Sequence, residues 1–152
     1  MAKKTFKGRV ITAGMYEGKC VVSHNGLNTL ATFQKSALKN AKQIIGSDQN
    51  NKDVFGKNLT GIALCLPQTI GSTTGGLVIQ AICSMKINPA AMLFSQPIDS
   101  LAASGVVLAS IWENSPIIAI DNLGDDFLKY AETDDTIKID TDGTVTVIKE
   151  GK

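Results

Sequence analysis

Three short apolar runs alternate with two helix-like segments in the middle of the chain, and this alternation limits the possible folds more than any other sequence feature. The runs are residues 62–66, 90–94 and 117–120, and a proline stands at one end of each. Continuous apolar runs of this length indicate strands covered on both faces. Residues 72–85 and 99–112 begin with capping side chains and then place apolar residues near helical spacing. The order predicts parallel strands joined by right-handed helical crossovers.

Both ends of the chain have the pattern of β-ribbons. Near the start, Phe6 and Val10 alternate with charged side chains. Near the end, residues 136–140 and 144–148 alternate in the same way on either side of Asp142-Gly143. This dipeptide between two alternating strands predicts a hairpin with a type I′ turn.

The expected fold is therefore α/β, with a small parallel β-α-β-α-β core over roughly Thr60 to Ile120 flanked by β-ribbons from both termini. The chain has 152 residues, of which 43% are apolar, so residues 1–152 suit one domain with a β/β/α layering. The polar stretch from about 34–58 is interpreted as a surface excursion, in which only residues 37–45 could form a short helix. Compact domains of this kind often serve as mobile lids.

Composition argues against several classes of function. Charged residues make up 19% of the chain, the net charge is +1 and Arg9 is the only arginine, so we expect no nucleic-acid partner. Lys7 and Arg9 interrupt any signal-like start, and no apolar run approaches the ~18 residues of a membrane span, so we expect a cytoplasmic chain without a membrane partner. Cys20, Cys65 and Cys83 stand far apart and are expected to be free core thiols. We therefore expect no metal site and no cofactor bound by this chain itself.

The segment between the first apolar run and the first helix is the main candidate for a binding site. Residues 67–76 read Pro-Gln-Thr-Ile-Gly-Ser-Thr-Thr-Gly-Gly. Ligands of parallel sheets collect at the carboxyl edge of the strands, where the free amides of a following helix can hold an anion. The pattern is neither a Walker loop nor Gly-x-Gly-x-x-Gly. On this evidence alone, Ser72 or Thr74 could simply cap the helix.

This segment and several spaced motifs resemble the small swivelling subunit of the aconitase-X type of hydro-lyases. The motifs are Lys7-Gly-Arg-Val10 with Gly14 and Gly18, Gly56-Lys-Asn-Leu-Thr-Gly61, Pro67 through Gly71-Ser-Thr73, Asn88-Pro-Ala-Ala91, Asp99, Gly105-Val-Val-Leu-Ala109 and Ser115-Pro-Ile-Ile118. Each motif is short, but their order and spacing are together fairly specific and cover most of the chain. Two family features are absent. Ile70 stands where the family usually has an arginine, and residues 27–33 replace an aromatic-glycine patch.

The resemblance implies a swivelling β/β/α domain that closes over a larger catalytic subunit, which holds an iron–sulfur cluster and most of the substrate contacts. Members of the family dehydrate small hydroxy acids, either cis-3-hydroxy-L-proline or mevalonate 5-phosphate. The family's proton-accepting serine corresponds to Ser72, and Gly71, Thr73 and Thr74 are then expected to bind substrate. The implied activity is that of a dehydratase subunit that is inactive without its large subunit.

The main alternative is a non-catalytic module that binds an anion or regulates a partner. A phosphohistidine carrier is excluded, because it needs a histidine just inside the first helix and the only histidine is His24, at a turn. His24 is interpreted as solvated. Asp99 is interpreted as a helix cap, and Asp121, at the end of the third apolar run, is a weaker site candidate.

Overall fold

The computed structural model describes residues 2–70, 75–113 and 116–149. Within these residues, one eight-stranded sheet has the order β1-β10-β9-β3-β5-β7-β8-β2. Its strands are β1 Ala2–Lys7, β2 Arg9–Thr12, β3 Tyr16–Val22, β5 Ala63–Leu66, β7 Ala91–Phe94, β8 Ile118–Asp121, β9 Thr136–Ile139 and β10 Thr144–Lys149. A small second sheet pairs β4 Leu27–Asn28 with β6 Thr69–Ile70. The helices are α1 Thr29–Leu38, α2 Gly75–Ser84, α3 Ser100–Leu108, which continues as a π-helical turn over Ala109–Glu113, and α4 Asp125–Tyr130.

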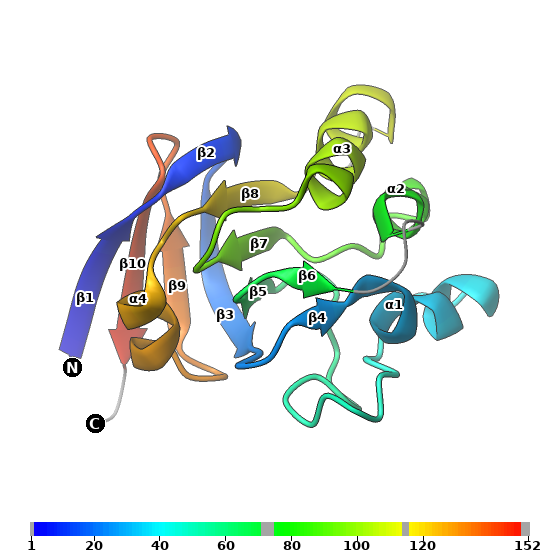
Figure 1. Cartoon of the computed structure of the whole chain (residues 1–152), viewed down its shortest axis with the longest axis horizontal. Helices are drawn as coiled ribbons and strands as arrows, with labels where there is room; N and C mark the ends of the chain where they lie inside the picture. The colour runs from blue at the N-terminus through cyan, green and yellow to red at the C-terminus, as the bar shows by residue number, and fades with distance from the viewer. Residues whose placement is uncertain (1, 71–74, 114–115, 150–152) are drawn as a thin grey trace.

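Three layers lie side by side in Figure 1: the terminal ribbons with α4, the central strands, and helices α1 to α3. The middle strands bury both faces, as their apolar runs predict. Leu64 and Leu66 of β5 contact the core under the helices, whereas Ala63 and Cys65 contact the core under the ribbons. The expected parallel β5-α2-β7-α3-β8 core and the ribbons from both termini are confirmed.

Strand β3 joins the ribbon layer to the parallel layer, a role that its sequence does not reveal. Its first half, Tyr16 to Lys19, pairs antiparallel with β9. Its last three residues, Cys20 to Val22, pair parallel with β5. The parallel part of the sheet therefore has one strand more than the apolar runs indicated.

The prediction of a short helix at residues 37–45 is wrong, because the helix in this region, α1, begins and ends earlier. Asn28 caps its first turn by accepting a hydrogen bond from the Ala31 amide at 3.0 Å. Beyond the helix, Asn40 adopts a positive φ of 50°. The chain then forms a narrow loop over residues 44–59, closed by paired backbone bonds such as Leu59 N–H to the Ile44 carbonyl at 2.8 Å.

The hairpin between β9 and β10 is confirmed, but its expected type I′ turn is wrong. Asp142 does not have a positive φ, whereas Gly143 has a φ of +91°. The Gly143 N–H donates to the Asp140 carbonyl at 3.2 Å, and the Asp140 N–H donates to the Thr144 carbonyl at 3.0 Å. This is a three-residue loop with a left-handed glycine, which requires only one residue at positive φ.

Gly143→Ala should destabilise the chain, because two costs coincide at this position. A Cβ on Gly143 would lie 2.8 Å from the Gly8 carbonyl oxygen, in a backbone conformation that side chains disfavour. We expect a loss of about 1–3 kcal/mol in thermal or urea unfolding. Gly56→Ala is the matched control, since Gly56 has a φ of +76° with nothing within 4 Å of its Cβ position. An equal loss in both variants would mean that the contact with Gly8 is unimportant.

No helix in the described part of the chain is both long and apolar enough to span a membrane.

Candidate functional site

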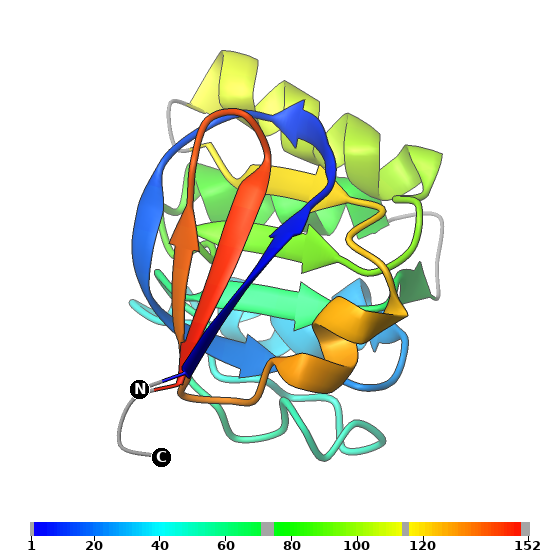
Figure 2. The ribbon, with the colours of Figure 1, turned by 90° about the vertical axis from the view of Figure 1, so that its left-hand side faces the viewer.

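The carboxyl ends of the parallel strands lie together at one edge of the sheet, which faces the viewer in Figure 1 and the right-hand side in Figure 2. Strand β6 runs along this edge, and α2 begins there. The four predicted site residues, Gly71, Ser72, Thr73 and Thr74, link β6 to α2 and lie outside the described residues. Side chains from β3, β6, β8 and α3 surround that link at the same edge.

Asp99 caps α3, as predicted, and also anchors β6. One of its carboxylate oxygens accepts the Ala102 amide at 3.0 Å, and the other accepts a hydrogen bond from the hydroxyl of Thr69. Thr69 is the first residue of β6. The strand that leads to Ser72 is thus attached to the start of the second crossover helix.

Asp121 lies at the expected edge, but its carboxylate is fully engaged. Its side chain is 0% exposed and accepts hydrogen bonds from Arg9 Nε at 2.9 Å, from Arg9 Nη2 at 2.6 Å and from the Ile98 amide at 2.8 Å. The hydrogen bond with Asp121 raises the pKa of the Arg9 guanidinium. Because these groups satisfy each other, Asp121 acts as a structural residue that joins β2, β8 and the start of α3.

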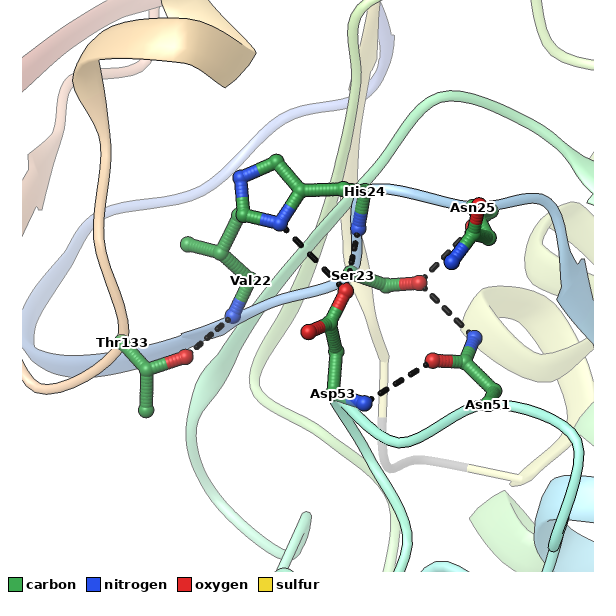
Figure 3. Close-up of polar contacts among 7 residues, drawn as sticks. All are labelled: Val22, Ser23, His24, Asn25, Asn51, Asp53 and Thr133. Carbon is green, nitrogen blue, oxygen red and sulfur yellow. Dashed lines mark hydrogen bonds and ion pairs between the residues drawn. The ribbon is translucent and has the colours of Figure 1, made fainter.

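His24 is largely exposed, as expected for a solvated residue, and it also has a carboxylate partner. It lies two residues after the end of β3, at the carboxyl edge. Asp53 Oδ2 accepts the backbone N–H of His24 at 2.8 Å and lies 3.3 Å from His24 Nδ1 (Figure 3). The ring is 57% exposed, and its other nitrogen, Nε2, points away from the residues drawn.

A buried polar network holds this pair in place. The Asn51 side chain donates to Ser23 Oγ at 2.9 Å, and Ser23 Oγ donates to the Asn25 carbonyl at 2.7 Å. Asn51 Oδ1 in turn accepts the Asp53 amide at 3.2 Å. Ser23 and Asn51 are 0% and 2% exposed, so water cannot replace these bonds. The network fixes the excursion against the turn that follows β3.

Sequence analysis missed Ser23, Asn51 and Asp53 as parts of this arrangement. The only available signal was the polar composition of residues 34–58, which was interpreted as a surface excursion. Asn51 lies in a polar run, yet it is buried because it pairs with a side chain 28 positions away. No periodicity in the sequence marks such a contact.

The three cysteines do not form a cluster site. Cys20 and Cys65 lie in the core under the ribbons and Cys83 in the core under the helices, and all three are buried. A hydrogen bond with Cys20 and burial raise the pKa of the Cys65 thiol well above its ordinary value. Among the described residues, no group of three or more His, Cys, Asp or Glu side chains is placed to hold a metal ion.

Comparisons with known proteins agree along nearly the whole chain. The family described as the aconitase X swivel domain matches residues 5–147. The phosphomevalonate dehydratase small subunit of Pyrococcus furiosus is 31% identical over 105 residues, which cover 69% of this chain and 72% of that protein. The protein of the same name from Methanosarcina mazei is 24% identical over 148 residues, which cover 97% of this chain and 93% of that one. The crystal structure of Thermococcus kodakaraensis aconitase X in its holo-form supports the fold, with a TM-score of 0.79 at 24% identity over 96% of this chain and 99% of that chain.

Proposed function

Because the chain belongs to the aconitase X swivel-domain family, as its motifs predicted, we propose that it is the small subunit of a dehydratase acting on mevalonate 5-phosphate. The observation that carries the proposal is the family match over residues 5–147 together with relatives named phosphomevalonate dehydratase small subunit. The family motifs in the sequence are also compatible with cis-3-hydroxy-L-proline as the substrate. The names of the relatives favour mevalonate 5-phosphate.

Dehydration of a hydroxy acid begins with removal of a proton from the carbon beside a carboxylate. In this proposal Ser72 accepts that proton. A serine is a weak base, so its oxyanion needs donors already aimed at it, and Gly71, Thr73 and Thr74 would supply backbone amides and hydroxyls at the start of α2. The anchoring of Thr69 by Asp99 supports this assignment, because it holds the strand that leads into the loop.

The reaction also needs a group that helps hydroxide leave, such as a metal ion, and among the described residues no group of three or more His, Cys, Asp or Glu side chains is placed to hold one. In the proposal this group belongs to a larger subunit, where an iron–sulfur cluster would supply a Lewis acid. The only arginine, Arg9, is paired with Asp121. The chain would therefore act only after docking onto that subunit, as the small-subunit names of the relatives suggest.

The test is reconstitution with the larger subunit encoded by the same organism. We expect the two chains to co-purify and to consume mevalonate 5-phosphate, while neither chain does so alone. Absorbance of the unsaturated product, with mass spectrometry of its loss of water, measures the reaction. Turnover by this chain alone would contradict the need for a partner, and a complex that acts on cis-3-hydroxy-L-proline instead would contradict the substrate.

A second candidate function, a non-catalytic anion-binding or regulatory module, is favoured by one observation. Ile70, the last described residue before the loop, is half-exposed and apolar, and it packs beside Gly26. It therefore gives the loop no charge of its own. The Ser72 variant discussed below separates the two functions, because a loop that binds through backbone amides does not depend on the hydroxyl.

A further inference from the structure

We propose that His24 binds the phosphate group of the substrate through Nε2, and that Asp53 is the positioning residue for its ring. The inference rests on the proposed function, because it takes the substrate to be a phosphorylated hydroxy acid. Four observations carry it: the aim of the ring, its buried support, its place at the sheet edge, and the engagement of the only arginine.

Two contacts to a single oxygen aim the ring. Asp53 Oδ2 accepts the His24 backbone N–H at 2.8 Å and lies 3.3 Å from Nδ1. Rotation of the ring would break the second contact while the first holds the carboxylate in place. In the charged form both ring nitrogens donate, so Nδ1 donates to Asp53 and Nε2 is left to donate outward. Figure 3 shows Nε2 pointing away from Asp53 and the other residues drawn.

The carboxylate partner of the ring is itself held in place by a buried side chain. The carboxamide of Asn51 contacts Ser23 Oγ at one end and the Asp53 amide at the other. Asn51 is 2% exposed, so both contacts are made out of water, where a lost hydrogen bond is costly. The excursion thus carries Asp53 to His24 across 29 positions of sequence and holds it there.

The turn that carries His24 lies beside the strand that leads to Ser72. The Leu27 amide donates to the Gln68 carbonyl at 2.9 Å, and β4 pairs with β6. Gly26 faces the side chain of Ile70 so closely that a Cβ there would lie 2.7 Å from it. His24 is thus at the edge where ligands of parallel sheets bind, on a neighbouring strand end and not in the loop itself.

The proposed substrate has a carboxylate at one end and a phosphate at the other. The chemistry of the reaction indicates which end lies near Ser72. The proton leaves the carbon beside the carboxylate, so the carboxylate end belongs with Ser72 in the proposed function. The phosphate is at the other end of the molecule and needs a donor elsewhere on this edge. Arg9 is bound in a bidentate pair by Asp121. In its charged form His24, held by a carboxylate through Nδ1, offers through Nε2 the type of charge-assisted bond that phosphate favours.

The experiment compares His24→Gln with His24→Asn in the reconstituted complex. The amide of glutamine can reach the position of Nε2, whereas that of asparagine can replace only Nδ1 and its contact with Asp53. Each variant is assayed with mevalonate 5-phosphate and with mevalonate, which lacks the phosphate. Inhibition by inorganic phosphate gives a second readout of the same contact. Lys138→Gln, on the exposed face of β9, is the control for loss of one positive charge.

We expect His24→Asn to raise KM for the phosphorylated acid by about ten- to a hundredfold with kcat largely kept, as for loss of a charge-assisted bond. His24→Gln should recover part of the loss, and the inhibition constant of inorganic phosphate should rise in parallel. Kinetics with mevalonate should be the same in wild type and both variants. Asp53→Asn should raise KM for the phosphorylated acid by a smaller factor, because the ring remains but is less firmly held.

Several results would overturn the inference. A wild-type KM for the phosphorylated acid in His24→Asn would mean that His24 serves only to hold Asp53. Equal losses with both substrates would mean that His24 does not contact the phosphate, and an unchanged KM would mean that it contacts no part of the substrate. In each case the wild-type complex would still turn over, so the proposed function would stand. A wild-type complex inactive on both acids would instead refute the proposed function, and this inference with it.

Discussion

Ser72→Ala in the reconstituted complex should lower kcat by about a hundredfold to ten-thousandfold, while KM for mevalonate 5-phosphate changes little. This fall in kcat is the one expected when a positioned general base is removed. KM is expected to hold because the amides of the loop and the contacts from the larger subunit bind substrate without the hydroxyl. Steady-state kinetics, with the binding of substrate to the variant measured by calorimetry, separates the two quantities.

Ser84→Ala is the matched control for this prediction. Ser84 is exposed and ends α2, at the opposite end of the helix from the loop. Its loss should leave both kcat and KM unchanged. If Ser72→Ala also left turnover intact, the base would lie elsewhere and the loop would only cap α2. A variant that lost substrate affinity but kept kcat would favour the anion-binding module.

Asp121→Ala should lower the melting temperature of the chain more than other exchanges of aspartate. The carboxylate is 0% exposed and joins β8 to β2 through Arg9 and to the start of α3 through the Ile98 amide. Removal leaves the Ile98 N–H without its acceptor, which alone costs about 1–3 kcal/mol. The two bonds with Arg9 are lost as well, although that side chain is 59% exposed and water can replace part of them.

Differential scanning calorimetry should therefore show a fall of about 5 °C or more, given about 2–4 °C per kcal/mol for a chain of this size. Asp126→Ala is the control, since Asp126 is exposed on the first turn of α4. Its melting temperature should stay close to that of the wild type. Equal melting temperatures for the two variants would show that the buried pair does not hold β2 and α3 to the sheet.

The parallel core could be predicted because it depends on local composition. The runs that became β5, β7 and β8 are apolar at every position, and the structure buries both faces of each strand. Their order along the chain, with a helix between each pair, leaves one handedness for the crossovers. The terminal hairpin was predictable for the same reason, since alternation and a glycine turn are read from a few neighbouring residues.

The boundary of α1 and the type of turn at Gly143 were harder to predict from the sequence, because alternative local conformations differ little in free energy. Asn28 and the residues after it could cap a helix or continue a strand, and packing selected the helix. Asp-Gly suits more than one hairpin turn. The register of β9 against β10 leaves three residues in the loop and so selects the form with one left-handed glycine.

By itself, the sequence determined the layered α/β architecture, the family, and the position of a glycine- and hydroxyl-rich loop after a buried strand. Only the tertiary structure decided which polar groups meet at the edge. The Arg9–Asp121 pair spans 112 positions, and the pair of His24 and Asp53 spans 29. Such contacts leave no periodic trace, because a polar side chain has the same local preferences whether it faces water or a partner. Burial decides between the two, since an unpaired buried group is costly, and burial follows from how the layers pack.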